Sequence, residues 1–175
     1  MSALAEPRPA ARLTPTELRR RWQEMLEDRL LAAVPFKVEL SERGAIEVSP
    51  AGTRHGILQA FVARELHRLR PDGTAITECA VLTEIGVRVP DVIWASAEFM
   101  RKHGMASPLP AAPEVCIEIV SPSNRAAEME EKKAAYLAAG AIEVWLVPEH
   151  GAAQIFAAGG PIDASRFGFE FRLPS

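Results

Sequence analysis

Two short segments decide the fold: residues 86–94, GVRVPDVIW, and residues 114–125, EVCIEIVSPSNR. Each contains an apolar run of strand length that carries one acidic residue, Asp91 in the first and Glu118 in the second. Because side chains alternate along a strand, each acid shares its face with apolar neighbours. Burying an unpaired carboxylate is costly, so each acid needs a cation, a hydrogen-bond donor or an opening to solvent.

The two acids can form one site if their strands are neighbours. Adjacent strands lie ~4.8 Å apart, so both carboxylates could reach one Mg²⁺ at ~2.1 Å. The alternative is a pair of strand-end acids held by arginine or solvent. A nearby lysine favours the first interpretation, and the next helix carries Lys132 and Lys133. A helix that returns antiparallel, rising ~1.5 Å per residue against ~3.3 Å in a strand, brings Lys132 level with Glu118.

Helical phase leaves the choice between the two lysines open. It places Lys133 near the centre of the apolar arc of the helix and Lys132 at the edge of that arc. An edge lysine can reach round into a cleft, while a central one must be buried or extend its amine to solvent. The alternative is that both are solvated and pair with nearby glutamates.

The rest of the chain predicts a sheet with helices packed on it. Expected elements are a helix at 14–33 started by a Thr14–Glu17 capping box, a hairpin of strands 36–40 and 45–48, a helix at 53–69, strands at 74–82 and 86–94 joined by a tight turn, a short helix at 96–103, a strand at 114–120, a helix at 125–139 ended by Gly140, a strand at 142–147, and short strands at 152–157 and 167–172. This order is typical of an α/β or α+β fold. Residues 1–13 are expected to be a loose arm and 14–175 one domain.

Composition narrows the class of protein. The 175 residues are 48% hydrophobic with a net charge of −3, which suits one globular domain. We find no secretory signal and no run of the ~18 apolar residues that a membrane span needs. Cys79 and Cys116 lie in apolar runs and are expected to be inert buried thiols of a bacterial-type cytoplasmic protein. Phosphate-loop, dinucleotide, nucleophile-elbow and zinc spacings are absent from the sequence, so no organic cofactor is expected.

Charge is unevenly distributed along the chain. Residues 1–70 carry 12 Lys and Arg against 9 Asp and Glu, while residues 71–175 carry 8 against 14. This asymmetry is consistent with a phosphate-facing surface beside a carboxylate cluster, and equally with charge scatter.

The segments GVRVPDVIW, EVCIEIVSPSNR, EKKAAYLAAG and AIEVWLV, with IEVSPAGTRHG upstream, resemble the Uma-two family of "putative restriction endonucleases". The resemblance covers about residues 36–157. It implies a PD-(D/E)xK, restriction endonuclease-like fold: a mixed sheet flanked by helices, with the core order helix-strand-strand-strand-helix-strand. The helix at 14–33 and the following hairpin would be additions at the N-terminus.

The resemblance also implies roles for individual residues. Asp91 and Glu118 would be catalytic and hold Mg, or Mn, and Lys132 would be the catalytic lysine that this family keeps on the helix. Secondary candidates are Glu47, His55 and Lys133. Candidate DNA contacts, expected to show salt-dependent affinity, are Arg19, Arg20, Arg21, Arg64, Arg68 and Arg70.

The sequence and the resemblance together thus favour a Mg-dependent endonuclease that hydrolyses DNA phosphodiester bonds. The resemblance implies a homodimer with DNA as its partner. One alternative is an inactive nuclease-fold module for binding or assembly. Another is a metal-dependent hydrolase of a different phosphate ester, which competition by nucleotides would reveal. Convergence of Asp91, Glu118 and Lys132 is the structural test of the catalytic hypothesis.

Overall fold

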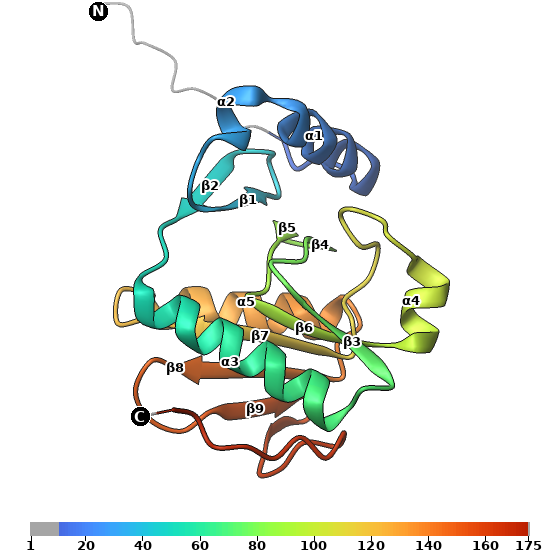
Figure 1. Cartoon of the computed structure of the whole chain (residues 1–175). Helices are drawn as coiled ribbons and strands as arrows, with labels where there is room; N and C mark the ends of the chain where they lie inside the picture. Colours follow the sequence, from blue (N-terminus) through green and yellow to red (C-terminus); the bar gives the residue numbers. More distant parts are fainter. Residues whose placement is uncertain (1–10, 175) are drawn as a thin grey trace, which may run out of the picture.

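The computed structural model describes residues 11–174 and contains two β-sheets with helices packed against them (Figure 1). The helices are α1 (Pro15–Glu27), α2 (Arg29–Ala32), α3 (Thr53–Leu69), α4 (Ala97–His103) and α5 (Ala126–Ala138). The strands are β1 (Lys37–Ser41), β2 (Ile46–Ser49), β3 (Gly73–Thr77), β4 (Val81–Thr83), β5 (Gly86–Arg88), β6 (Val92–Ser96), β7 (Val115–Val120), β8 (Glu143–Pro148), β9 (Gln154–Ala157) and β10 (Gly160–Ile162). The smaller sheet has the order β2-β1-β5-β4, and the larger has the order β10-β9-β8-β7-β6-β3.

The predicted α+β class is confirmed, and so is the core order. Helix α3, strands β3, β6 and β7, helix α5 and strand β8 follow one another along the larger sheet, with the β4–β5 hairpin inserted between β3 and β6. Strands β7 and β8 run parallel, and α5 connects them across the sheet. Gly140 follows α5 with a φ of 114°, a left-handed conformation that favours glycine. Most of the predicted loose arm at 1–13 lies outside the described residues.

The predicted N-terminal helix starts as expected but is interrupted. Thr14 and Glu17 form the capping box, with the Thr14 side chain accepting from the Glu17 amide and Glu17 accepting from the Thr14 amide. Asp28 has extended backbone angles, which end α1, and its side chain accepts hydrogen bonds that start α2. The single helix expected at 14–33 was therefore wrong at Asp28, because this residue serves as the cap of a second helix.

Two predicted strands, at 74–82 and 86–94, are each divided between the two sheets. Their outer halves pair as β3 with β6 in the larger sheet, and their inner halves pair as β4 with β5 in the smaller sheet. The chain changes sheet at Glu78, whose φ is 51°, and at Pro90, which has no backbone N–H to donate. The prediction of two continuous strands was wrong, and the division places Asp91 directly before β6 at the junction of the sheets.

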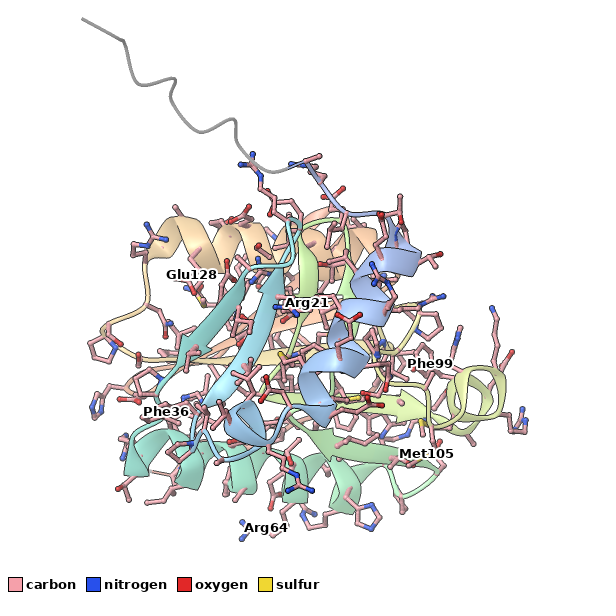
Figure 2. All side chains as sticks on the ribbon, turned by 90° about the horizontal axis from the view of Figure 1, so that it is seen from above. Arg21, Phe36, Arg64, Phe99, Met105 and Glu128 are labelled. Atoms are coloured by element: carbon pink, nitrogen blue, oxygen red, sulfur yellow. The ribbon has the colours of Figure 1, made fainter. Side chains whose placement is uncertain are left out.

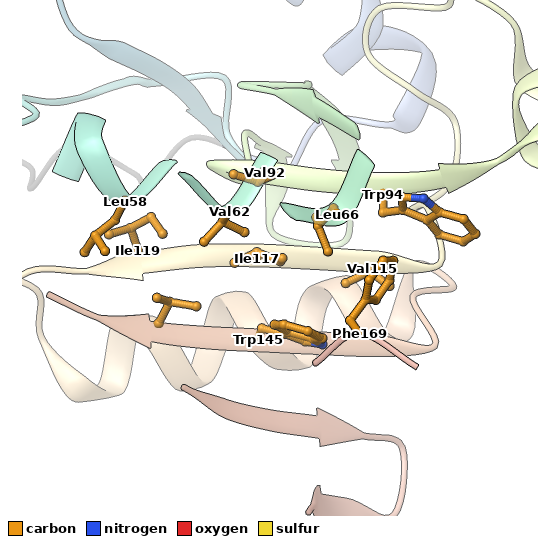
Figure 3. Close-up of a cluster of buried hydrophobic side chains, with 11 residues drawn as sticks. Leu58, Val62, Leu66, Val92, Trp94, Val115, Ile117, Ile119, Trp145 and Phe169 are labelled. Atoms are coloured by element: carbon orange, nitrogen blue, oxygen red, sulfur yellow. The ribbon is translucent and has the colours of Figure 1, made fainter. Parts of the chain in front are cut away.

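One face of the larger sheet is covered by α3 in a wholly apolar cluster (Figure 3). Leu58, Val62 and Leu66, one turn apart along α3, pack over β6 and β7. The opposite face packs against α5 and the β4–β5 hairpin through a second apolar cluster that includes Cys116 and Tyr136. The strands that carry the two acids are thus fixed by apolar packing on both faces.

The C-terminal segment differs from the prediction. Within residues 163–174 there is no strand, so the one expected at 167–172 was wrong, and the last strand is β10 instead. Phe167, Phe169 and Phe171 alternate as in a strand, but they do so to pack their rings around Trp94 and Trp145. Alternating aromatic residues here reflect packing onto the sheet rather than pairing within it.

Both cysteines of the chain are unpaired thiols. Cys116 lies in β7 as expected, whereas Cys79 lies in the turn after β3 rather than in a strand. Burial raises the pKa of Cys79 to about 11 and that of Cys116 well above its ordinary value. No helix in residues 11–174 has the length and apolar composition that crossing a membrane would require.

Candidate active site

Asp91 and Glu118 meet at the junction of the two sheets. In the antiparallel register of β6 and β7, Val92 lies opposite Ile117, so the next pair outward is Asp91 and Glu118. Both side chains are buried, with 1% and 2% of the residue surface exposed. One cation lies between them, since the Lys37 Nζ is 2.7 Å from Asp91 Oδ1 and 3.2 Å from Glu118 Oε2.

The other oxygens of these two carboxylates are fixed by hydrogen bonds. Asp91 Oδ2 accepts from the Ile119 amide at 2.7 Å, and Glu118 Oε1 accepts from the Tyr136 hydroxyl at 2.6 Å. His55 Nε2 lies 3.2 Å from Asp91 Oδ1. Each carboxylate is therefore oriented by the scaffold and directs its second oxygen toward the same point.

Lys132 lies beside Glu118, as predicted from the rise of the helix. Its Nζ is 3.4 Å from Glu118 Oε1 and 3.0 Å from Glu39 Oε2, and the Glu39 Oε1 also accepts from the Val89 amide at 2.7 Å. We call Lys37, Glu39, Asp91, Glu118 and Lys132 the ionic cluster. The structure thereby brings Asp91, Glu118 and Lys132 together, and it adds two residues that the sequence analysis did not include.

Lys133 points away from the ionic cluster. Its Nζ pairs with Glu130 and lies 4.0 Å from the centroid of the Phe156 ring. Lys132 is 4% exposed, whereas Lys133 is only half-buried. The predicted helical phase, which put Lys133 at the centre of the buried arc, was wrong. The buried face of α5 is instead formed by Met129, Lys132, Ala135 and Tyr136.

Of the two secondary candidates upstream, His55 lies in the site and Glu47 does not. Glu47 is on β2, opposite Glu39 in the hairpin register, and its side chain is 46% exposed. The Arg88 guanidinium contacts Glu47 and lies 3.5 Å from Glu39 Oε2. Glu47 is thus linked to the ionic cluster only through Arg88 and Glu39. Its ion pair with Arg88 connects β2 with β5 in the smaller sheet.

Burial and the neighbouring charges shift the pKa values of the residues in the ionic cluster. Burial opposes ionisation of Asp91, but the hydrogen bond from His55 and the charge of Lys37 hold its pKa well below the ordinary value. Glu118 is buried as well, and burial raises its pKa despite the opposing charges of Lys132 and Lys37. Burial disfavours the charge on Lys132, yet Glu118 and Glu39 raise its pKa above the usual range. The cluster therefore keeps a full ammonium beside two carboxylates of different basicity.

Above the ionic cluster opens a cavity of about 440 Å³, which we call the cleft. Its lining combines the Ser49–Gly52 turn, the start of α3 and the loop before α5, with hydroxyl and amide groups from Ser49, Ser121, Ser123 and Asn124. The carboxylates that line it are Glu78, Asp91, Glu118, Glu128 and Glu149, and the cationic groups are Lys37, Lys132 and His55. The cleft thus has a surplus of negative charge.

The predicted DNA-contacting arginines lie outside the cleft. Arg19, Arg20 and Arg21 are on α1, where Arg20 and Arg21 pair with Glu24. The other three lie at the far end of α3, where Arg64 and Arg68 pair with Glu65 and Arg70 pairs with Asp72. In Figure 2, Arg64 projects from α3 on the side of the molecule opposite Glu128. Five of these six arginines, all but Arg19, pair with acidic side chains, and none of the six lines the cleft.

The site has the donor set of a hard divalent cation. Asp91 and Glu118 each direct one oxygen to a common point that a cation already occupies, and their other oxygens are held by the protein. Among residues 11–174, no three His, Cys, Asp or Glu side chains are grouped to hold a metal ion. Mg²⁺ commonly uses only one or two carboxylates, with water and substrate phosphate completing its shell. Two carboxylates are thus a donor set that Mg²⁺ or Mn²⁺ could use together with water and phosphate.

Sequence reasoning missed Lys37, Glu39 and the role of the Tyr136 hydroxyl. Lys37 and Glu39 are two positions apart in β1, so their side chains share one face of the strand. The chain has only four lysines in total. That pattern in a predicted hairpin was the available signal. However, the hairpin is distant in sequence from β7, and only the packing of the two sheets brings them together.

Comparison with known proteins adds the following findings. The model of the Uma2 family, described as "Putative restriction endonuclease", matches residues 22–164. A crystal structure of "a putative nuclease belonging to DUF820" from Anabaena variabilis is similar with a TM-score of 0.60 and 18% identity, covering 78% of this chain and 86% of that one. A cryo-electron microscopy structure of a DrdV–DNA complex has a TM-score of 0.41 and 12% identity, covering 91% of this chain but 14% of the other. No curated protein matches the chain.

Proposed function

The chain belongs to the Uma2 family, and from this premise we propose that it is a divalent-metal-dependent endonuclease that hydrolyses DNA phosphodiester bonds in the cleft. The observation that carries the proposal is the convergence of Asp91 and Glu118 on one cation, with the Lys132 ammonium beside Glu118. The Uma2 match and the fold shared with a nuclease structure support the same class of activity.

Asp91 and Glu118 would hold Mg²⁺ or Mn²⁺ through the oxygens that now face Lys37. A divalent ion held there would polarise the scissile phosphate and lower the pKa of a bound water. Tyr136 and the Ile119 amide would keep the two carboxylates in position during the reaction. Lys132, held between Glu39 and Glu118, would direct its charge toward the developing negative charge on the phosphate.

The charge of the cleft also supports metal dependence. Five carboxylates line it, against two ammonium groups and one histidine. A DNA backbone carries one negative charge per phosphate, so these acids would repel it unless a divalent cation were bound. We expect DNA binding in the cleft to require metal, and the serine and asparagine groups of the lining to contact phosphate oxygens once it is present.

The test is nicking of supercoiled plasmid by the purified protein with Mg²⁺ or Mn²⁺. Wild-type protein should nick, and Asp91→Asn and Lys132→Met should each lose at least about 100-fold in rate. Lys133→Met is the matched control, because it removes the same charge from the neighbouring residue, which lies outside the ionic cluster. This control should retain wild-type activity within about twofold, and EDTA should abolish nicking.

Three results would contradict the proposal in different ways. Nicking that survives in both Asp91→Asn and Lys132→Met would assign the activity to another site or to a contaminant. Inhibition by mononucleotides at concentrations far below those of DNA phosphate would favour a hydrolase of another phosphate ester. A folded wild-type protein that binds DNA but cuts none, with either metal and several plasmids, would favour a binding module.

We also propose that the protein acts as a homodimer, because one cleft per protomer would serve one strand each. Light scattering on the DNA complex measures this directly. A monomeric complex that linearises plasmid without a nicked intermediate would exclude the dimer.

A further inference from the structure

Lys37 holds a position that neither the fold nor the proposed reaction explains by itself. Its ammonium is the only group of the ionic cluster that contacts both Asp91 and Glu118 through the oxygens facing the cleft. Lys132 contacts Glu118 and Glu39 instead. Within residues 11–174, these two oxygens accept from no backbone amide or hydroxyl, and the one further contact is that of His55 with Asp91.

A divalent ion bound by Asp91 and Glu118 would need the space that the Lys37 ammonium now fills. Mg²⁺ binds carboxylate oxygens at ~2.1 Å, closer than the 2.7 and 3.2 Å of the Lys37 contacts. Two cations cannot share this point, because their charges repel strongly at a few ångströms in a poorly solvated site. Binding of the ion therefore requires Lys37 to move.

The surroundings of Lys37 give its side chain a place to go. The residue lines the cleft and also a second cavity of about 230 Å³, which lies between α1 and β1 and is walled by Trp22, Met25 and Phe36. Glu78 lines both cavities as well, and its carboxylate is exposed. Because Glu78 also lines the cleft, the flexible stem of a lysine allows the Lys37 ammonium to leave the two carboxylates for the Glu78 side of the cleft while β1 stays in place.

We propose that Lys37 is a resident cation of the metal-free site, which holds Asp91 and Glu118 together and is displaced into the cleft when a divalent ion binds. Once displaced, its charge would face the phosphate backbone of the substrate. This inference rests on the proposed function, since it assigns the same site a competition between an internal and an external cation. It predicts that the protein spends part of its metal-binding energy on moving Lys37.

The first experiment measures Mn²⁺ binding by electron paramagnetic resonance, without DNA or turnover. Lys37→Met should bind Mn²⁺ at least about tenfold more tightly than wild type, because the competing charge is gone. Lys102→Met, which removes the same charge from an exposed position on α4, should bind as wild type does. Adding Asp91→Asn to Lys37→Met should abolish the tight binding. Equal or weaker binding by Lys37→Met would overturn the proposal.

The second experiment uses the wild-type chain and does not depend on a variant folding. Lysines are acetylated in a short pulse, with and without saturating Mn²⁺, and quantified by peptide mass spectrometry. Acetylation of Lys37 should be slow without metal and at least about fivefold faster with it, while Lys102 and Lys133 should react at unchanged rates. Bound Mn²⁺ with an unchanged Lys37 rate would overturn this inference alone. Absence of Mn²⁺ binding in both wild type and Lys37→Met would overturn the metal site of the proposed function as well.

Discussion

Two buried glutamates on neighbouring strands are stabilised in opposite ways. Glu118 lies on β7, and its oxygens contact Tyr136, Lys132 and Lys37 at the base of the cleft. Glu143 lies at the start of β8 and is 0% exposed, yet no Lys, Arg or His side chain of residues 11–174 forms an ion pair with it. Its oxygens accept from the Trp145 indole, the Ser165 hydroxyl and the Arg166 amide.

The difference separates a structural acid from a candidate functional one. Three neutral donors with fixed geometry satisfy both oxygens of Glu143, and two of them, from Ser165 and Arg166, tie the C-terminal segment to the sheet. Glu118 instead has charged partners and opens on a cavity that can admit a ligand. Burial of an acid is common to both, and the kind of partner distinguishes them.

The largest effect is expected from Glu118→Ala. It removes one carboxylate from a cluster with two buried ammonium groups, and breaking such a pair costs about 3–5 kcal/mol. Chemical denaturation of the two proteins measures this loss, and plasmid nicking should fall below detection. Glu118→Gln keeps the shape and a hydrogen-bond acceptor for Tyr136, so it should be less destabilising but equally inactive. A stable, active Glu118→Ala would show that the ionic cluster is dispensable.

An intermediate effect is expected from Glu143→Ala. Three neutral donors lose their acceptor, and leaving buried donors unsatisfied costs about 1–3 kcal/mol. The same denaturation assay measures the loss. Nicking at a temperature where the variant is folded should remain within about threefold of wild type, because Glu143 does not line the cleft. If the activity fell as far as in Glu118→Gln, the distinction between the two acids would fail.

The smallest effect is expected from Arg20→Ala on α1. Arg20 and Glu24 form an ion pair 3.2 Å apart, with side chains that are 71% and 48% exposed. Exposed pairs of this spacing contribute about 0.3–0.5 kcal/mol, so the midpoint of denaturation should barely move. This result would show that an ion pair exposed to water contributes little to the free energy of unfolding of this protein. A loss above about 1 kcal/mol would contradict this expectation.

Local sequence patterns predicted much of the fold. The hairpin of β1 and β2, helix α3 at Thr53–Leu69 and the β7-α5-β8 unit followed from periodicity, caps and turn residues. The errors occurred where residues act through distant partners. Glu78 and Pro90 divide two strands between sheets, and the phenylalanines of the C-terminal segment alternate to meet Trp94 and Trp145.

The site was predicted in the same uneven way. Asp91 and Glu118 stood out because an acid inside an apolar strand is costly unless it has a partner. That Lys132 lies level with Glu118 followed from the rise of a helix over a strand. That Lys132 lies on the buried face of α5 did not follow from the sequence, because this face is set by the elements packed on it. Lys37 and Glu39 were missed because they approach β7 from another sheet.

The sequence by itself determined the class of fold, the family resemblance and the acids of the site, since these depend on periodicity, on local spacing and on the cost of burying charge. Only the tertiary structure decided which cations meet those acids. Lys37 and Asp91 are 54 residues apart, and Lys132 and Glu39 are 93 apart. Contacts over such separations depend on how sheets and helices pack, and the same lysine would be solvated on an isolated strand or helix.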